Sequence, residues 1–408
     1  MTKADLQSEA FQANPYQGYA VLRSDSPVHY VKGPMGLGSW LITRHQEAKA
    51  ALADPRLSKD VRLAPEWLRS MGAGAGDEGL LGANLLSSDP PDHTRQRRLV
   101  SKAFTRSRME GLRPRVREIT DELVDVIAYG GEVDIMSALA VPLPITVICE
   151  LLGIPVVDRA DFRAWTQMTL TPPVSEENIE IRKQGNAAMD RYLTHLIARL
   201  RCETDGELAY DSQPDLLSAL IVSSDDHDQL SERELLGTIK LLLVAGQNTV
   251  NLIGNGVLAL LQHPDQLALL SERPNLLPSA VEELMRYDGP IERATPRFTV
   301  EDVEIAGVTI PAGSAVSVVI AAADHDPEHF PNPERLDITR TNNPHLAFGN
   351  GIHFCLGAPL ARVEGQVAIG TLVRRFPAMK LAGRPEELRW LGRGANIIRG
   401  LETLPVVI

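Results

Sequence analysis

The longest apolar stretch with helical periodicity, LLGTIKLLLVAGQNTVNLIGNGVLALLQ, sets the scale of the fold. Ser231 followed by Glu234 forms a capping box at its start, and His263-Pro264 stops it. The pattern predicts one helix of about 31 residues, roughly 46 Å long at 1.5 Å per residue. A helix of that length crosses a whole domain, so we expect the chain to be mainly helical.

Three glycines lie inside this predicted helix, Gly246, Gly254 and Gly256. Each costs on the order of 1 kcal/mol relative to alanine, so something must compensate. Three explanations are open: close packing with another helix, a tolerated defect, or a flat ligand against the small surface of Ala245 and Gly246. Thr249 lies four residues after Ala245 on the same face, so its hydroxyl would point at whatever approaches there.

Strand-like segments are few and short. Runs of β-branched residues punctuated by glycine at 28–33, 39–43 and 303–321 predict small sheets. No internal repeat is visible, and the longest low-complexity segment, GAGAGDEG at 72–79, is interpreted as a mobile loop. We therefore expect residues 1–408 to form a single domain that is mainly α with minor β structure.

Composition narrows the class of protein. With 44% hydrophobic residues the chain can bury a large core, and its net charge of −12 argues against nonspecific nucleic-acid binding. The three cysteines, Cys149, Cys202 and Cys355, contain no CxxC pair, which predicts neither a disulfide framework nor a structural zinc site. The N-terminus lacks the apolar run of a signal peptide, and prolines break the most hydrophobic stretch, 138–157. We expect a cytoplasmic enzyme without a membrane span.

One segment reverses the overall charge. Residues 92–118 contain nine Lys or Arg and three acidic residues, a local charge of +6 in a chain of net charge −12. Such a run is often a solvated helix face. The second interpretation is a docking patch for an acidic partner, since a field of opposite sign steers association.

A glycine-rich loop, HLAFGNGIHFCLG at 345–357, surrounds Cys355. A lone cysteine is usually a small buried hydrophobe, but here the context favours a metal ligand. A ligating thiolate is stabilised by backbone N–H groups and by a following helix whose N-terminus faces it, and the residues after Cys355 have helical periodicity. Gly349, Gly351 and Gly357 can adopt positive φ and leave no side chains between backbone and ligand.

Phe348, Gly351, Cys355 and Gly357 fill the pattern F-x-x-G-x-x-x-C-x-G, which resembles the haem-binding signature of the cytochrome P450 superfamily. AGQNT at 245–249 is similar to that family's oxygen-activating helix motif. The resemblance extends over nearly the whole chain and is strongest with soluble bacterial members that act on macrolides and other secondary metabolites. It implies the family's mainly α triangular prism with small β-sheets.

The resemblance also implies roles for single residues. Cys355 would ligate the iron of one non-covalent haem b, within the loop that contains Phe348, Gly351 and Gly357. The residues expected to bind the haem propionates are His93, Arg97, Arg297 and His353. The residues expected around the activated oxygen are Ala245, Gly246, Asn248 and Thr249, with Thr249 as hydrogen-bond donor in proton delivery. The buried Glu-Arg-Arg cluster of the family is expected at Glu283, Arg286 and Arg335.

The substrate pocket implied by the resemblance has a largely aliphatic lining. Its expected walls include residues 62–88 and the stretch around Thr171, Pro172 and Pro173. The contacts expected to be nearest the substrate are Asn84, Leu85, Leu241, Val244, Ile291, Ile397 and Ile398. Such a lining suits a bulky apolar natural product, for example a macrolide, terpenoid or steroid, although aliphatic residues also form any ordinary core.

The implied activity is insertion of one oxygen atom from O2 into a C–H or C=C bond, in secondary-metabolite biosynthesis such as that of antibiotics. Electrons would come from NAD(P)H through a ferredoxin reductase and a ferredoxin, and the protein would be a monomer. One position departs from the family: Asn248 stands where Asp or Glu is usual, and an amide cannot carry a proton in and out at neutral pH. Thr249 favours monooxygenation over reductase, isomerase or peroxide-dependent chemistry. The non-enzymatic alternative is a haem sensor.

Overall fold

The computed structural model describes residues 6, 8–32, 38–70, 82–127, 130–171, 175–203, 213, 215–223, 230–391 and 397–408. These residues are mostly helical with small sheets, as expected from the sequence. They pack as two compact units. Unit 1 consists of Met1–Leu57, Met109–Pro144 and Asn248–Ile408, and unit 2 of Ser58–Arg108 and Ile145–Gln247. That the two together form one domain stays a prediction.

The main sheet of unit 1 has the strand order β1-β2-β8-β5-β3. Its strands are β1 (Val28–Lys32), β2 (Gly38–Ile42), β8 (Ala315–Val318), β5 (Arg297–Thr299) and β3 (Leu57–Ser58). β1 and β2 pair antiparallel with Val28 opposite Ile42, and β8 runs parallel to β2. The predicted strands at 28–33 and 39–43 are therefore confirmed.

Two smaller sheets complete the β structure described in unit 1. The predicted β region at 303–321 contains the hairpin of β6 (Val303–Ile305) and β7 (Val308–Ile310) in addition to β8. Ala306 and Gly307 form its turn with φ of 50° and 77°, the positive values that tight two-residue hairpins require. The other sheet has the order β4-β10-β9, with β4 (Glu132–Asp134), β10 (Pro405–Val407) and β9 (Lys380–Leu381).

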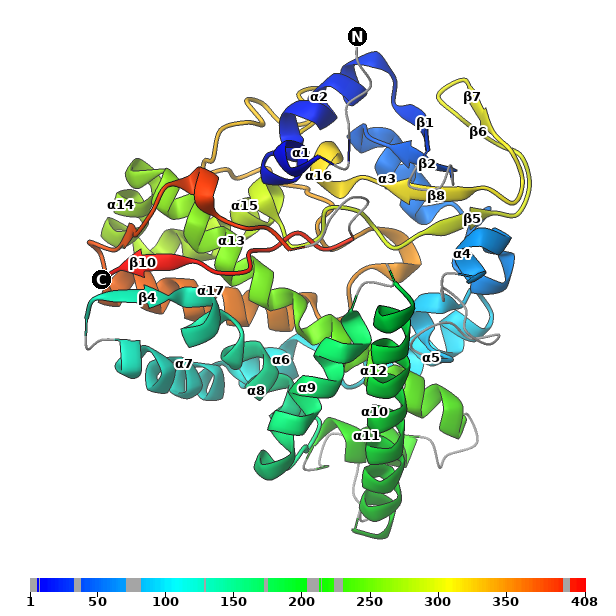
Figure 1. Ribbon diagram of the computed structural model, residues 1–408, viewed down its shortest axis with the longest axis horizontal. Helices are drawn as coiled ribbons and strands as arrows, with labels where there is room; N and C mark the ends of the chain where they lie inside the picture. The colour runs from blue at the N-terminus through cyan, green and yellow to red at the C-terminus, as the bar shows by residue number, and fades with distance from the viewer. Residues whose placement is uncertain are drawn as a thin grey trace. The chain divides into compact units, whose positions relative to one another are not determined.

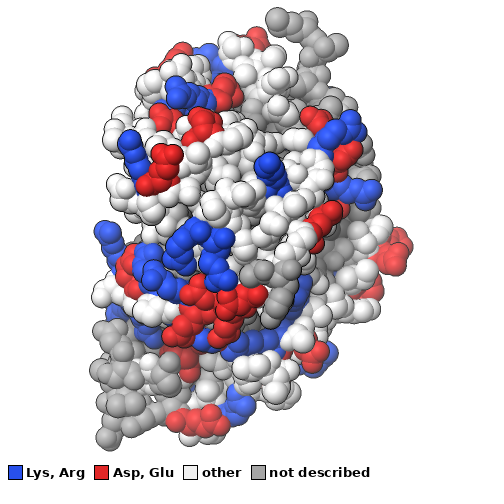
Figure 2. Space-filling model, turned by 90° about the vertical axis from the view of Figure 1, so that its left-hand side faces the viewer, with Lys and Arg blue, Asp and Glu red and all other residues white. Residues whose placement is uncertain are grey.

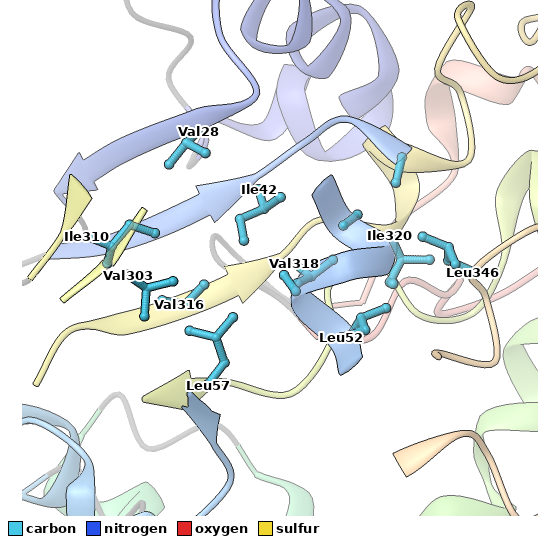
Figure 3. Packing of buried hydrophobic residues seen from close by; sticks show 13 residues of the cluster. Val28, Ile42, Leu52, Leu57, Val303, Ile310, Val316, Val318, Ile320 and Leu346 are labelled. Atoms are coloured by element: carbon cyan, nitrogen blue, oxygen red, sulfur yellow. The ribbon is translucent and has the colours of Figure 1, made fainter. Parts of the chain in front are cut away.

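Aliphatic side chains from the main sheet and from helix α3 (His45–Ala53) form one hydrophobic core (Figure 3). Ile42, Val316 and Val318 come from adjacent strands, and Leu52 comes from the helix that covers them. This packing follows from the sequence, because branched side chains in strands place one face of a sheet against a helix.

The helices of unit 1 are α1 (Glu9–Ala13), α2 (Pro15–Asp25), α3, α7 (Arg113–Ile127), α13 (Asn248–Gln262), α14 (Pro264–Glu272), α15 (Leu277–Asp288), α16 (Ile320–Ala323) and α17 (Ala358–Arg375). α13 packs against both α15 and α17, and α17 also packs against α7 (Figure 1). A Cβ at Gly254 would lie 2.5 Å from Sδ of Met136, and one at Gly256 would lie 3.0 Å from Cδ1 of Ile369. Close packing is therefore the explanation that holds for these two glycines.

The longer elements described in unit 2 are all helices. They are α4 (Glu66–Ser70), α5 (Asp92–Ser101), α9 (Arg159–Leu170), α10 (Glu176–Glu203), α11 (Leu216–Ser223) and α12 (Glu232–Gly246). The chain passes between the units within α6 (Arg106–Gly111) and α8 (Pro142–Leu151). α9 and α10 pack closely, since a Cβ at Gly185 would lie 2.9 Å from the carbonyl oxygen of Trp165.

The prediction of a single helix from 231 to 263 is wrong at one position, because the structure has two helices there. Its capping box is confirmed: the N–H of Ser231 donates to Glu234 Oε2 at 2.8 Å, and the N–H of Glu234 donates to Ser231 Oγ at 3.3 Å. The helix is interrupted at Gln247, whose N–H donates to the carbonyl of Ala245 instead of the carbonyl four residues back. Gly246 and Gln247 thus divide the stretch into α12 and α13.

Residues 232–262 are long and apolar enough to cross a membrane by composition alone. However, 72% of the most apolar window is buried inside the molecule, as in the core helix of a globular protein.

Charged side chains form neighbouring clusters of both signs on one face of the molecule (Figure 2). Ion pairs link surface helices, for example Arg375 of α17 to Asp125 of α7 at 2.9 Å. The net charge of −12 is therefore not spread as one acidic surface on this face. Exposed pairs of this kind contribute little to stability, about 0–1 kcal/mol each.

The packing of α12 generates a prediction on stability. Gly237 faces the backbone of Ala83, and a Cβ there would overlap the carbonyl oxygen of that residue. Gly237→Ala should lower the free energy of unfolding by about 1–3 kcal/mol, measured by urea denaturation, because a backbone atom cannot move aside cheaply. Gly111→Ala is the control, since a Cβ at Gly111 meets nothing within 4 Å. Equal effects of the two substitutions would contradict this packing.

Candidate functional site

The loop before α17 presents a single thiol. The N–H of Cys355 donates to the carbonyl of Phe348 at 2.8 Å, which closes the loop around the cysteine. Gly349 and Gly351 have φ of 76° and 77°, as predicted, because side chains are strained in this region. Gly357 does not share this conformation, since its φ is −79°. Cys355 is exposed.

The surroundings of this thiol fit a metal ligand. α17 begins three residues after Cys355, and the unpaired N–H groups of a helix N-terminus favour a negative thiolate. A Cβ at Gly357 would lie 4.0 Å from the sulfur, so glycine leaves that side of Sγ open. Within the described ranges no group of three His, Cys, Asp or Glu could hold a metal ion. In haem-thiolate proteins one cysteine thiolate is the protein ligand of the iron, and the macrocycle supplies others.

A partly exposed ion pair between Arg362 and Glu282 supports the loop. The guanidinium of Arg362 lies 4.4 Å from the ring centroid of Phe348 and donates to Glu282 of α15 at 2.6 and 2.8 Å. Burial alone would raise the pKa of Glu282, but the hydrogen bonds from Arg362 and His345 lower it to about 2. The Glu282 carboxylate is therefore charged at all physiological pH values. Its hydrogen bonds to Arg362 join α15 to α17, and the contact of Arg362 with Phe348 joins both helices to the loop.

The structure places the four expected propionate ligands in two groups. Arg297 and His353 belong to unit 1, as does Cys355. Arg297 is buried in β5 and donates to the carbonyls of Leu52 and Leu57 at 2.9 and 3.2 Å. His93 and Arg97 belong to unit 2, one turn apart on α5. Burial first, and then the positive charge of Arg97, lowers the pKa of His93.

At the start of α13, Thr249 forms a hydrogen bond with a carboxyl group that the sequence analysis missed. Its partner is Glu364 of α17, and both side chains are buried, with 6% and 2% exposed. Burial raises the pKa of Glu364 to about 8, while the hydrogen bond from Thr249 opposes the shift. Asn248 is partly buried, and Ala245 and Gly246 end α12.

The contact between Thr249 and Glu364 depends on a small neighbour. A Cβ at Gly365 would lie 2.9 Å from Cδ2 of Leu252, so glycine allows α17 to approach α13. The sequence does contain a signal for Glu364. Leu360 and Ala368, four residues before and after it, are buried, and the carboxyl group therefore lies on the apolar face of its helix.

The expected substrate contacts in unit 2 lie on helix α12 and in a short 3₁₀ turn. Leu241 and Val244 lie on α12, and Leu85 is buried in a short 3₁₀ turn. Asn84 caps this turn: its Oδ1 accepts from the N–H of Leu86 at 2.9 Å. Its amide also donates to a carbonyl at 2.7 Å, so its polar groups serve the local backbone. The loop at 72–79, Pro172 and Pro173 lie outside the described residues.

Expected substrate contacts in unit 1 lie side by side. Ile291 and Ile398 form an isolated antiparallel bridge, and the N–H of Glu292 donates to the carbonyl of Ile397 at 2.9 Å. These three isoleucines thus come from two segments that are more than 100 residues apart in the chain but adjacent in the fold.

The expected Glu-Arg-Arg cluster is corrected at its third member. Glu283 and Arg286 form an ion pair at 2.8 Å with both side chains fully buried. The second arginine is Arg340, whose Nε lies 3.1 Å from Glu283 Oε2. Arg335 is exposed and contributes only its backbone carbonyl, which accepts from Arg286 at 3.2 Å. The choice of Arg335 was wrong because the chain turns its carbonyl, and not its side chain, toward Arg286.

An exposed thiol before a helix, in a mostly helical chain, fits the single protein ligand that a haem-thiolate protein requires. Comparison with known proteins agrees: a family model described as Cytochrome P450 matches residues 156–389. Cytochrome P450 monooxygenase PikC of Streptomyces venezuelae is 49% identical, over 97% of this chain and 91% of that protein. 6-Deoxyerythronolide B hydroxylase of Saccharopolyspora erythraea is 44% identical, over 99% and 98%.

The solved structures agree as well. Cytochrome P450 PksS of the bacillaene polyketide synthase of Bacillus subtilis 168 has a TM-score of 0.88 and 38% identity, covering 98% of both chains. The chain belongs to the cytochrome P450 family. It is an oxidoreductase that incorporates oxygen.

The raised pKa of Glu364 predicts a pH dependence of stability. The folded protein holds this proton up to about pH 8, whereas the unfolded chain releases it at the ordinary pKa of 4.5. The free energy of unfolding therefore falls as pH rises between these values. Glu364→Gln should reduce that fall, measured by urea denaturation across this range. Glu118→Gln, at an exposed side chain, should leave it unchanged. An undiminished fall in Glu364→Gln would show that this carboxyl does not titrate as described.

Proposed function

We propose that the protein is a haem-thiolate monooxygenase that inserts one oxygen atom from O2 into a bulky apolar natural product. The observation that carries the proposal is Cys355, an exposed thiol closed into a glycine loop directly before α17. The substrate class is a macrolide or other polyketide, a terpenoid or a steroid. The product would belong to secondary metabolism, such as antibiotic biosynthesis.

Cys355 would ligate the iron of haem b, within the loop that contains Phe348, Gly351 and Gly357. When bound, the haem iron activates O2, and the thiolate ligand supplies electron density that favours O–O cleavage. The cations and donors proposed for the propionates are His93, Arg97, Arg297 and His353. Arginine suits this role because its planar donors match carboxylate geometry.

The proton path would begin at Glu364. Because its pKa is raised to about 8, the carboxyl is protonated at neutral pH and can pass a proton to Thr249 Oγ1 while Thr249 gives up its own. Asn248 has no ionisable group and can only orient water. The chain thus has a protonated carboxyl on α17 in place of the acid that is missing beside Thr249.

Aliphatic contacts support the substrate class. Leu241, Val244, Ile291, Ile397 and Ile398 would contact the apolar body of the substrate, with Leu85 and Asn84 in the neighbouring turn. One relative is named a 6-deoxyerythronolide B hydroxylase, and the solved neighbour belongs to a polyketide synthase. A large apolar lining with few polar groups fits such molecules.

Electrons would come from NAD(P)H through a ferredoxin reductase and an acidic ferredoxin, to a monomer in the cytoplasm. Arg98 and Lys102 are exposed at the end of α5, where an acidic partner would contact them. Arg95, in the same basic segment, forms an ion pair with Glu234 of the capping box. The proposed docking patch contains Arg95, Arg98 and Lys102.

The haem assignment has a direct test. Cys355→Ala should abolish the red-shifted Soret band that reduced haem-thiolate protein shows with carbon monoxide, because alanine cannot ligate iron. The measurement is the difference spectrum of the purified protein. Cys202→Ala is the matched control, at another exposed cysteine, and should keep the band. Retention of the band in Cys355→Ala would refute the assignment.

The proton path predicts how two neighbouring substitutions differ. Thr249→Ala should lower product formed per NAD(P)H consumed by about threefold or more, since removal of a general acid–base group diverts reducing power into peroxide. Asn248→Asp should give equal or faster turnover and a changed solvent isotope effect, because the carboxylate adds a second route. The control is Thr371→Ala, at a buried threonine on α17. It should leave the product formed per NAD(P)H consumed unchanged. Full coupling in Thr249→Ala would exclude this path.

A further inference from the structure

Two adjacent segments of unit 1, 290–293 and 397–399, invert the usual pattern of burial. Their isoleucines are not buried, and Ile397 is 37% exposed. Their charged side chains are buried: Glu292, Arg293 and Arg399 are only 7%, 4% and 5% exposed. Buried charges and exposed large apolar side chains are the informative exceptions in a folded protein. The pattern indicates that the charges serve to present the isoleucines.

The backbone contacts between these segments are few. The N–H of Arg399 donates to the carbonyl of Pro290 at 2.9 Å, and the N–H of Glu292 donates to that of Ile397 at 2.9 Å. Ile291 and Ile398 form the single bridge between these hydrogen bonds. So short a ladder is marginal by itself, because even a full two-stranded hairpin is barely stable in water. The position of the isoleucines must therefore be fixed by other contacts.

Arg399 supplies those contacts. Its Nε donates to Asp288 Oδ1 at 2.5 Å, and its Nη1 donates to the carbonyl of Gln12 at 2.8 Å. The guanidinium lies 3.6 Å from the ring centroid of Trp390. The hydroxyl of Tyr16 donates to the same oxygen of Asp288. Charge-assisted bonds in a buried site are strong and directional, so they define where residue 399 lies.

Segment 290–293 is held by hydrogen bonds to the N-terminal helix α2. The hydroxyl of Tyr19, on α2, donates to Glu292 and accepts from Arg293 Nε at 3.0 Å. Arg399 donates to the carbonyl of Gln12 at the end of the preceding helix α1, and its guanidinium lies 5.5 Å from the ring centroid of Tyr16 on α2. The two segments therefore share one support, and the spacing between Ile291 and Ile398 depends on it.

We propose that Arg399 is a positioning residue that determines substrate specificity. Through Asp288, Tyr16 and the carbonyl of Gln12, it sets the position of Ile397 and Ile398 beside Ile291, so that these side chains form one wall for the apolar body of the substrate. The inference rests on the proposed function, in which these isoleucines contact the substrate. Loss of Arg399 would shift this wall and leave the iron ligand Cys355 in place.

The test uses two nitrogen ligands of haem iron that differ in size, imidazole and clotrimazole, each titrated spectroscopically into the holoenzyme. Imidazole reaches only the iron, whereas the three phenyl groups of clotrimazole must fit against the walls. Arg399→Gln should weaken clotrimazole binding by about fivefold or more, the usual effect of losing a well-packed anchor, with imidazole affinity unchanged. Tyr16→Phe, which removes one hydroxyl, should give a smaller loss of the same kind.

The matched control is Arg384→Gln, since Arg384 is an exposed arginine paired to Glu387 at 2.8 Å, and it should change neither affinity. Unchanged clotrimazole affinity in Arg399→Gln would overturn the proposal. So would a parallel loss of both ligands and of the carbon monoxide band, because Arg399 would then only hold the fold. Absence of that band in the unmodified protein would instead count against the haem-thiolate function itself.

Discussion

The close approach of α13 to α17 is the constraint on which the chemistry of this protein depends. Cys355 lies three residues before α17 and Thr249 lies at the start of α13, so the distance between these helices would set how near the proposed iron ligand is to the proposed proton donor. Gly365 permits the approach, because any Cβ there would press on Leu252. The same approach brings Glu364 to Thr249 and buries its carboxyl, which keeps the acid protonated near neutral pH.

Local sequence signals predicted local structure well. The capping box at Ser231 and Glu234, the strands at 28–33 and 39–43 and the glycines at 349 and 351 are all found as expected, because each depends on residues close in the chain. The interruption at Gln247 was not foreseen, since apolar periodicity continues through it. The periodicity of apolar residues shows which face of a helix is buried. It does not show where one backbone hydrogen bond of the helix is altered.

Side-chain partners across the fold were harder to predict. Arg335 matched a sequence motif, but Arg340 forms the ion pair with Glu283, because a motif does not show which way an exposed turn directs its side chains. Glu364 was missed for a related reason. A single glutamate in a helix is usually solvated, and although Leu360 and Ala368 mark its face as apolar, only the tertiary packing shows that it hydrogen-bonds Thr249.

The proposed catalytic residues and the proposed substrate wall have largely different supports within unit 1. Cys355, Thr249 and Glu364 depend on α13, α15 and α17, whereas Ile397 and Ile398 depend on Arg399 and the N-terminal helices α1 and α2. Within unit 1 these two supports share Asp288, the last residue of α15, which accepts from Arg399. In the proposed function, changes in the wall would alter which molecule is bound, while the proposed iron ligand and proton donor keep their own contacts. One fold can host many different sites in this way.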